Sequence, residues 1–295
     1  MKLIFLGTSS GVPTASRNQT SVLLNYCSEY ILFDCGEGTQ RQLLKAGVSV
    51  MNITRICISH FHGDHILGLP GLLQTLALNN YTRTLKIYGP RGTKKFIQGI
   101  ISSFRFVLGI NLEIHEVQSS KILEADDFFL YTEKLEHYNC VGYKFQEKDK
   151  RKINLKYIKK IGIPRGPLLG QLQQGKSVKW KNKVIKSKDA TFLKKGRSIV
   201  FIFDTAYAKN AVKLARNADL VICESTYLSD MEKRAAEYKH LTAHQAAEIA
   251  KKARVKQLIL THFSQRYKDK QEFLKEAKKV FPNVSLAEDF MKVEI

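Results

Sequence analysis

Six residues in the first quarter of the chain constrain its fold and chemistry more than any other feature. Residues 60–65 read His-Phe-His-Gly-Asp-His, so three imidazoles and a carboxylate occur within six positions. They follow directly after residues 54–59 (TRICIS), which predict a strand. Zinc prefers imidazole and carboxylate ligands, and the bend that Gly63 permits lets Asp64 and His65 turn toward a second ion. The cluster therefore predicts a metal centre rather than a group of core histidines.

Two metal ions need further ligands, and three candidates stand at the ends of predicted strands. His137 follows FFLYTEKLE, Asp204 follows SIVFIF, and His262 follows QLILT. A single histidine at a strand end is more often structural than catalytic. Together with the cluster, however, these three residues complete two coordination shells, with Asp204 as the natural bridging carboxylate. His115 and His244 remain outside this set, and we expect His244 at the surface of a helix.

The rest of the chain alternates strand and helix signals. Strands are predicted at residues 2–7, 21–26, 30–35, 85–88, 198–204, 220–223 and 257–261, with three more between 111 and 147. Helices are predicted at residues 40–46, 68–78, 92–104, 242–253 and 270–280. Many strands in each half, with helices outside them, predict an α/β fold that is either a four-layered αββα sandwich or a doubly wound sheet. No stretch approaches about 18 consecutive apolar residues, so we expect no membrane span.

The basic charge is concentrated in one segment. The chain has 48 Lys and Arg against 27 Asp and Glu, a net charge of +21. Residues 148–195 contain 16 basic and 2 acidic residues, which is two-thirds of the net charge in one-sixth of the chain. A lysine-rich surface of the thermophilic kind would not be so localised. The distribution instead favours a polyanionic partner, either nucleic acid or an anionic membrane.

The middle of this segment, residues 162–175, reads GIPRGPLLGQLQQG. Its prolines and glycines forbid a long helix and predict sharp turns. A disordered linker is one interpretation, but aliphatic residues such as Leu168 and Leu172 can pack together. We therefore expect an ordered arm that protrudes from the fold and contacts phosphates.

The cysteines and the N-terminal residues indicate the cellular compartment of the protein. The five cysteines are scattered, odd in number and without CxxC spacing, which predicts no disulfide framework and favours a reducing cytoplasm. The N-terminus has only five apolar residues before Gly7, which predicts a first strand rather than a signal peptide.

These residues resemble the metallo-β-lactamase superfamily and, more narrowly, the short form of the ribonuclease Z (tRNase Z) family, which removes the 3′ trailer of precursor tRNA. The resemblance covers nearly the whole chain. It rests on FLGT at 5–8 with Pro13 and Arg17-Asn18, FDCGEGTQ at 33–40, the stretch from His60 to Leu72, His240-Leu-Thr-Ala, and THFSQRY at 261–267. It implies one αββα metallo-β-lactamase domain over residues 1–295, with a flexible basic arm inserted at 148–195.

The resemblance also implies the ligands and the reaction. One zinc would be held by His60, His62 and His137, and the other by Asp64, His65 and His262, with Asp204 bridging. This makes two Zn²⁺ per subunit, and Mn²⁺ would fit the same site. Asp64 would orient the attacking water, and His240, oriented by Glu224, would protonate the leaving oxygen. Cleavage would leave a 3′-hydroxyl on the tRNA and a 5′-phosphate on the trailer.

Substrate contacts and assembly follow from the same resemblance. Thr14, Arg17 and Arg266 would meet acceptor-stem phosphates or nucleotides at the cleavage site. Gly166 and Pro167, in the Gly-Pro-rich tip of the arm, would bind the tRNA body. Family members use the arm across a homodimer, in which one subunit grips the tRNA that the other cuts.

Two classes of alternative share part of this pattern. Other hydrolases of the superfamily, such as a small-molecule phosphodiesterase, an arylsulfatase-like esterase or a glyoxalase II-type thioesterase, use the same ligands but require no basic arm. The sequence His240-Leu-Thr-Ala argues against the thioesterase. A nucleic-acid-binding protein with a vestigial metal site is the non-enzymatic alternative, and the complete set of seven ligands argues against it.

Overall fold

The computed structural model describes residues 1–104 and 108–295, which form two compact units. The core unit comprises residues 1–124, 130–145 and 198–295. The basic unit comprises residues 125–129 and 146–197. The lysine-rich segment predicted from the sequence, residues 148–195, belongs to the second of these units.

The core unit is built on two seven-stranded sheets. The first has the order β20-β1-β3-β4-β5-β6-β7, and its strands from β4 to β7 run parallel. Its strands are β1 (Lys2–Gly7), β3 (Ser21–Tyr26), β4 (Glu29–Phe33), β5 (Arg55–Cys57), β6 (Thr84–Gly89), β7 (Asn111–Glu116) and β20 (Lys292–Glu294).

The second sheet has the order β19-β17-β16-β15-β10-β9-β8, with β15, β16, β17 and β19 parallel. Its strands are β8 (Ser120–Glu124), β9 (Phe128–Leu135), β10 (Cys140–Glu147), β15 (Ser198–Ile202), β16 (Leu220–Glu224), β17 (Gln257–Thr261) and β19 (Val284–Leu286). Two short strands, β2 (Ser9–Ser10) and β18 (Phe263–Ser264), pair with each other.

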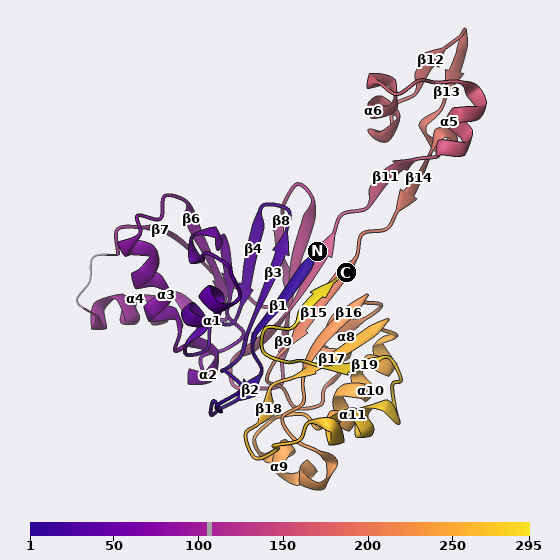
Figure 1. The fold of residues 1–295 in the computed structure, drawn as a ribbon. Helices are drawn as coiled ribbons and strands as arrows, with labels where there is room; N and C mark the ends of the chain where they lie inside the picture. The colour runs from indigo at the N-terminus through magenta and orange to yellow at the C-terminus, as the bar shows by residue number, and fades with distance from the viewer. Residues whose placement is uncertain (105–107) are drawn as a thin grey trace. The chain divides into compact units, whose positions relative to one another are not determined.

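Helices cover the outer face of each sheet (Figure 1). The first sheet packs against α1 (Thr39–Lys45), α3 (Leu69–Leu78) and α4 (Thr93–Ser103). The second packs against α8 (Lys209–Ala215), α10 (Ala243–Ala253) and α11 (Gln271–Lys278). Shorter helices are α2 (Gly63–Ile66) and α9 (Glu232–Glu237), with 3-10 turns η1 (Val50–Asn52) and η2 (Ser229–Met231).

The inner faces of the two sheets meet through aromatic side chains. The rings of Phe33 and Phe201 stack with centroids 3.6 Å apart, and those of Tyr26 and Phe145 lie 5.0 Å apart. Because side chains alternate along a strand, a strand buried on both faces is largely apolar, as residues 199–202 (IVFI) of β15 are. The predicted αββα sandwich is therefore confirmed, and the single doubly wound sheet is excluded.

The basic unit has a small core of its own. Strand β11 (Lys150–Ile153) pairs antiparallel with β14 (Thr191–Lys194), and β12 (Val178–Trp180) pairs with β13 (Lys183–Ile185). Its helices are α5 (Leu155–Ile161), α6 (Pro167–Gln173) and α7 (Ser187–Ala190). The buried side chains that they share are Ile158, Ile163, Leu172, Val178, Ile185 and Ala190. Gly162 ends α5 with a positive φ of 70° and Pro167 begins α6, so the predicted turns separate two short helices.

Most predicted elements are confirmed with ends shifted by one or two residues. Between residues 111 and 147 the structure has four strands, β7 to β10, where three were predicted. In the described part of the chain, every helix is too short or too polar to cross a lipid bilayer.

Candidate metal centre

The histidine cluster starts where strand β5 ends. His62 has an extended backbone and occupies the N-cap position of α2, whereas Asp64 and His65 lie inside that short helix. The change from extended to helical backbone brings the side chains together: the ring of His60 lies 4.6 Å from that of His62 and 4.3 Å from that of His65. The cluster is therefore a local site, as its sequence predicts.

The first group of ligand atoms joins this cluster to two strand ends of the other sheet. It contains His60, His62, His137 and Asp204, whose ligand atoms all lie within 4.8 Å of one another. His137 follows β9 and Asp204 follows β15. Both sheets of the core unit thus contribute to the centre.

The second group contains Asp64, His65 and His262, again with ligand atoms within 4.8 Å. The Nε2 atom of His262 lies 3.2 Å from Oδ2 of Asp64 and 3.2 Å from Nε2 of His65. His262 follows strand β17 and is completely buried.

Asp204 links the two groups with its two carboxylate oxygens. Its Oδ1 lies 3.4 Å from Nε2 of His65 and 3.2 Å from Nε2 of His262. Its Oδ2 lies 3.4 Å from Nε2 of His60 and 3.8 Å from Nε2 of His137. One oxygen of this carboxylate therefore faces each group of candidate ligands.

The chemistry of these atoms fits a divalent metal. His60 Nε2 and Asp204 Oδ1 are buried and have no hydrogen-bond partner among the described residues. Leaving such atoms unpaired costs about 1–3 kcal/mol each, and a cation between them removes that cost. Histidine and carboxylate donors of this kind suit zinc.

Outer hydrogen bonds fix the orientation of the ligand rings. In His60, His65, His137 and His262, Nδ1 lies within 3.0 Å of an oxygen outside the centre, which leaves Nε2 facing inward. The partners are Ser59 Oγ, Asp34 Oδ2, the Lys239 carbonyl and Thr226 Oγ1, respectively. Metal-binding histidines are held in the same way in known sites.

The pKa shifts of the candidate ligands differ in direction. Burial alone would lower the pKa of His65, but Asp204, Asp64 and Asp34 raise it well above its usual range. Burial, reinforced by neighbouring His60, lowers the pKa of His62, and burial lowers the pKa of His137 to about 4. Burial alone would raise the pKa of Asp204, but the neighbouring imidazoles of His262 and His65 hold it well below its usual range. Two neutral imidazoles and an ionised carboxylate are therefore available as ligands at neutral pH.

Asp34 is a supporting residue that the predicted site omitted. Its carboxylate accepts hydrogen bonds from the backbone N–H and the hydroxyl of Ser59, both at 2.7 Å, and from Nδ1 of His65 at 2.6 Å. Asp34 directly follows strand β4, a strand-end position like those that identified His137 and Asp204. Asp34 and His262 both have left-handed backbone, with φ of 56° and 61°.

His240 and Glu224 form a pair beside the ligands. His240 Nδ1 lies 3.1 Å from Glu224 Oε1 and 3.9 Å from Asp204 Oδ2. Glu224 is completely buried, and its Oε1 also accepts the backbone N–H of Thr205 at 2.7 Å. Burial alone would lower the pKa of His240, but Glu224 and then Asp204 raise it to about 9. The ring is therefore protonated at neutral pH.

The predicted substrate residues of the core unit have different environments. Arg17 is 7% exposed, and its Nη2 donates to the carbonyl oxygens of Ser264 and Tyr267. Thr14 is partly buried and its hydroxyl accepts the backbone N–H of Arg17 at 2.9 Å. Arg266 is exposed. Arg17 thus braces the loop that carries Arg266, and the second arginine is the one accessible to a substrate.

The remaining residues considered in the sequence are Gly166, Pro167, His244 and His115. Gly166 and Pro167 are exposed at the start of α6 in the basic unit. His244 is exposed on α10, as predicted. His115, in β7, stacks on Tyr88 with ring centroids 4.9 Å apart and contributes no ligand atom to the groups above.

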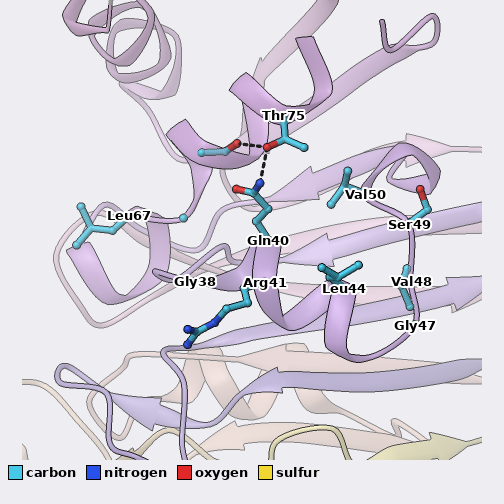
Figure 2. Close-up of a pocket in the computed structure, with 12 residues that line it drawn as sticks. Gly38, Gln40, Arg41, Leu44, Gly47, Val48, Ser49, Val50, Leu67 and Thr75 are labelled. Atoms are coloured by element: carbon cyan, nitrogen blue, oxygen red, sulfur yellow. Dashed lines mark hydrogen bonds between the residues drawn. The ribbon is translucent and has the colours of Figure 1, made fainter. Parts of the chain in front are cut away.

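A cavity of about 870 Å³ lies beside α1 and α3 (Figure 2). Its lining includes Leu44, Val48 and Leu67, with a hydrogen bond from Gln40 to Thr75 at one side. Leu44 and Leu67 are 77% and 56% exposed. The predicted ligands do not line this cavity.

Two family profiles match parts of the chain. Residues 1–101 match one described as "Anti-Pycsar protein Apyc1", and residues 187–263 match one described as "Beta-lactamase superfamily domain". The fold is similar to that of the metallo-beta-lactamase fold protein YhfI from Bacillus subtilis, with a TM-score of 0.73 at 21% identity over 100% of this chain and 98% of that one.

Relatives that match the full length of the chain identify its family more specifically. The chain is 40% identical to ribonuclease Z of Methanothermobacter thermautotrophicus, over 100% of this chain and 97% of the relative. It is 42% identical to ribonuclease Z of Prochlorococcus marinus subsp. pastoris, over 100% of both. The structure of human tRNase Z, short form, is similar with a TM-score of 0.74 at 30% identity, over 100% of this chain and 99% of that one. The chain therefore belongs to the ribonuclease Z family.

Proposed function

We propose that this tRNA 3′-processing endoribonuclease removes the 3′ trailer of precursor tRNA by zinc-dependent hydrolysis. Cleavage leaves a 3′-hydroxyl on the tRNA and a 5′-phosphate on the trailer. The observation that carries the proposal is Asp204, which directs one oxygen toward each of two ligand groups. Two ions bridged in this way suit displacement at a phosphodiester.

Seven residues would hold the ions, and Mn²⁺ would fit the same donors as Zn²⁺. The two groups are His60, His62 and His137 for one ion, and Asp64, His65 and His262 for the other, with Asp204 shared. Bound there, the ions supply Lewis acidity toward phosphate oxygens and water.

Asp64 orients the attacking water. Its Oδ2 accepts the backbone N–H of Gly11 at 2.7 Å and lies 3.2 Å from Nε2 of His262. A carboxylate fixed by two contacts holds a water in line with the scissile bond and accepts its proton.

His240 protonates the leaving group. As the water oxygen bonds to phosphorus, the bond from phosphorus to the 3′ oxygen breaks and its electron pair stays on that oxygen. An alkoxide is a poor leaving group, so a proton from the His240 imidazolium lowers the barrier. Glu224, 3.1 Å from Nδ1, holds the ring and stabilises its positive charge.

The basic segment supplies affinity for the tRNA body. Residues 148–195, with a net charge of +14, neutralise phosphates and release counterions. We expect this segment to protrude as an arm, with Gly166 and Pro167 at its tip. At the cleavage site, Thr14 and Arg266 bind substrate, and Arg17 acts through the loop that it braces.

A second copy of the chain covers the face around the cavity of Figure 2. Leu44 and Leu67, which line the cavity, are 77% and 56% exposed. Exposed aliphatic side chains gathered beside a cavity are typical of a protein interface. The homodimer is therefore the assembly that we assign.

We place the protein in the cytoplasm. All five cysteines are free thiols, and four of them are buried. A reducing compartment keeps such thiols free.

The test is to incubate the zinc-loaded protein with a precursor tRNA that carries a 3′ trailer and to map both new ends. We expect a single cut, with a 3′-hydroxyl and a 5′-phosphate, that is absent with Asp64→Ala. Intact metal binding and hydrolysis of a small phosphodiester or thioester, without cleavage of the tRNA, would instead assign one of the other hydrolase activities.

A further inference from the structure

We propose that Thr226 is a positioning residue, whose single hydroxyl couples the metal ligand His262 to the Glu224–His240 pair. Its Oγ1 lies 2.6 Å from Glu224 Oε2 and 3.0 Å from His262 Nδ1. It also lies 3.3 Å from His240 Nδ1. The inference rests on the roles proposed above for the ligand and for the pair.

The hydrogen atoms around this hydroxyl can be assigned from its partners. A threonine hydroxyl has one proton to donate, and the carboxylate oxygen of Glu224 is its acceptor. Thr226 therefore donates to Glu224 Oε2, and its oxygen accepts the proton on Nδ1 of His262. With the proton on Nδ1, the free lone pair of His262 is on Nε2, the atom that faces Asp64 and Asp204. Thr226 thus selects the tautomer that can bind a metal.

Burial makes this hydroxyl hard to replace. Thr226 is 2% exposed, and both Glu224 and His262 are completely buried, so solvent does not reach the contact. The three residues come together because β16 and β17 are parallel neighbours with Glu224 opposite Thr261. Thr226 and His262 stand just past these paired positions, at the same edge of the sheet. The coupling is therefore built into the strand register.

The Thr226 hydroxyl supports both the candidate ligand His262 and the Glu224–His240 pair. On one side it orients His262, and on the other it adds a hydrogen bond to the carboxylate that holds His240. Removing the hydroxyl leaves His262 Nδ1 and Glu224 Oε2 without this partner, and a proton that moves to Nε2 blocks the ligand atom. Loss of such an outer contact typically weakens metal binding about 10- to 100-fold.

Two substitutions at Thr226 and one control separate this role from packing. Thr226→Val keeps the side-chain shape and removes the hydroxyl, whereas Thr226→Ser keeps the hydroxyl. Thr261→Val is the matched control, because it removes a buried hydroxyl next to His262 in the chain. That hydroxyl has no hydrogen-bond partner within residues 1–104 and 108–295. Zinc affinity is measured by competition with a chromophoric chelator, and ¹H–¹⁵N spectra assign the ring nitrogen of His262 that carries the proton.

We expect Thr226→Val to lose affinity for one of two zinc ions about 10- to 100-fold and to change the His262 tautomer. Thr226→Ser and Thr261→Val keep the wild-type affinity. Should Thr226→Val fail to fold, Thr226→Ala carries the same expectation. Wild-type zinc binding in the variant without the hydroxyl, or an unchanged tautomer, overturns the inference.

The test of Thr226 and the test of the proposed function can fail independently of each other. A wild-type protein that cuts precursor tRNA, with a Thr226→Val variant that binds zinc normally, overturns the role of Thr226 alone. A wild-type protein that binds zinc and does not cut overturns the proposed function, while the zinc loss in Thr226→Val still supports the positioning role.

Discussion

Glu224 Oε1 lies 3.1 Å from Nδ1 of His240, and this carboxylate is completely buried. The imidazole therefore has a fixed charge partner on its inner side. That arrangement distinguishes His240 from His60, His137 and His262, whose outer nitrogens face hydroxyls or a carbonyl. His65 shares it, since its Nδ1 lies 2.6 Å from the buried carboxylate of Asp34.

We expect His240→Ala to lower kcat for precursor tRNA about 10²- to 10⁴-fold, because the leaving oxygen loses its proton donor. Zinc content, measured by mass spectrometry of the dialysed protein, remains at two ions. His240 also lies within ligand distance of Asp204 and His262. Loss of an ion in this variant would therefore make His240 a ligand instead of an acid.

The pH dependence of kcat tests the His240–Glu224 pair directly. Since the pKa of His240 is raised to about 9, its protonated form is present below that pH and is lost as the pH rises through it. Glu224→Gln removes the main cause of the increase, so the alkaline limb of kcat moves to lower pH. An alkaline limb that stays in place would show that another group controls it.

Asp204→Asn is expected to weaken binding of both ions, because each carboxylate oxygen faces a different ligand group. The measurement is zinc affinity for each of the two sites. Asp230→Asn makes the same chemical change at an exposed position and serves as the control. A loss confined to a single ion would assign Asp204 to one group.

Removal of the basic unit is expected to separate affinity from chemistry. Lys150 and Lys194 are paired across the β11–β14 ladder, so a two-residue turn can close the chain between them. We expect a higher KM for precursor tRNA and a shallower dependence on salt, because fewer phosphates are neutralised. Hydrolysis of bis(p-nitrophenyl) phosphate should be unchanged, and an equal loss of both activities would contradict the division of roles.

Leu44→Glu is expected to convert the homodimer to a monomer, because it places a charge on the apolar face beside the cavity. Sedimentation velocity measures the change. Leu155→Glu is the control, since Leu155 is 65% exposed in the basic unit. A dimer that survives the substitution at Leu44 would exclude this face as the interface.

The local pattern of apolar residues in the sequence was sufficient to predict much of the fold. The predicted strand 2–7 coincides with β1, because a continuous apolar run that ends in a glycine defines it. The number of strands between 111 and 147 was underestimated, since β7 and β8 are short, largely exposed and carry a weak apolar pattern. The choice between one sheet and two depends on contacts such as Phe33 with Phe201, which lie far apart in the sequence.

The convergence of the candidate ligands was predictable where they are dense in the sequence or follow strands. Residues 60–65 needed no tertiary information, and His137, Asp204 and His262 were expected from their strand ends. Asp34 and Thr226 were missed because neither is a ligand, and their role appears only once distant segments meet. The burial of Arg17 could not be predicted from the sequence either, because it depends on the carbonyls of a loop some 250 positions away.

The left-handed backbone at Asp34 and His262 sets stability against activity. For residues with a Cβ atom, this conformation costs about 1–2 kcal/mol each. Glycine would relieve the strain at either position, yet it would remove the carboxylate or the imidazole on which the centre depends. Each position therefore keeps a strained backbone together with the side chain whose hydrogen bonds hold the centre in place.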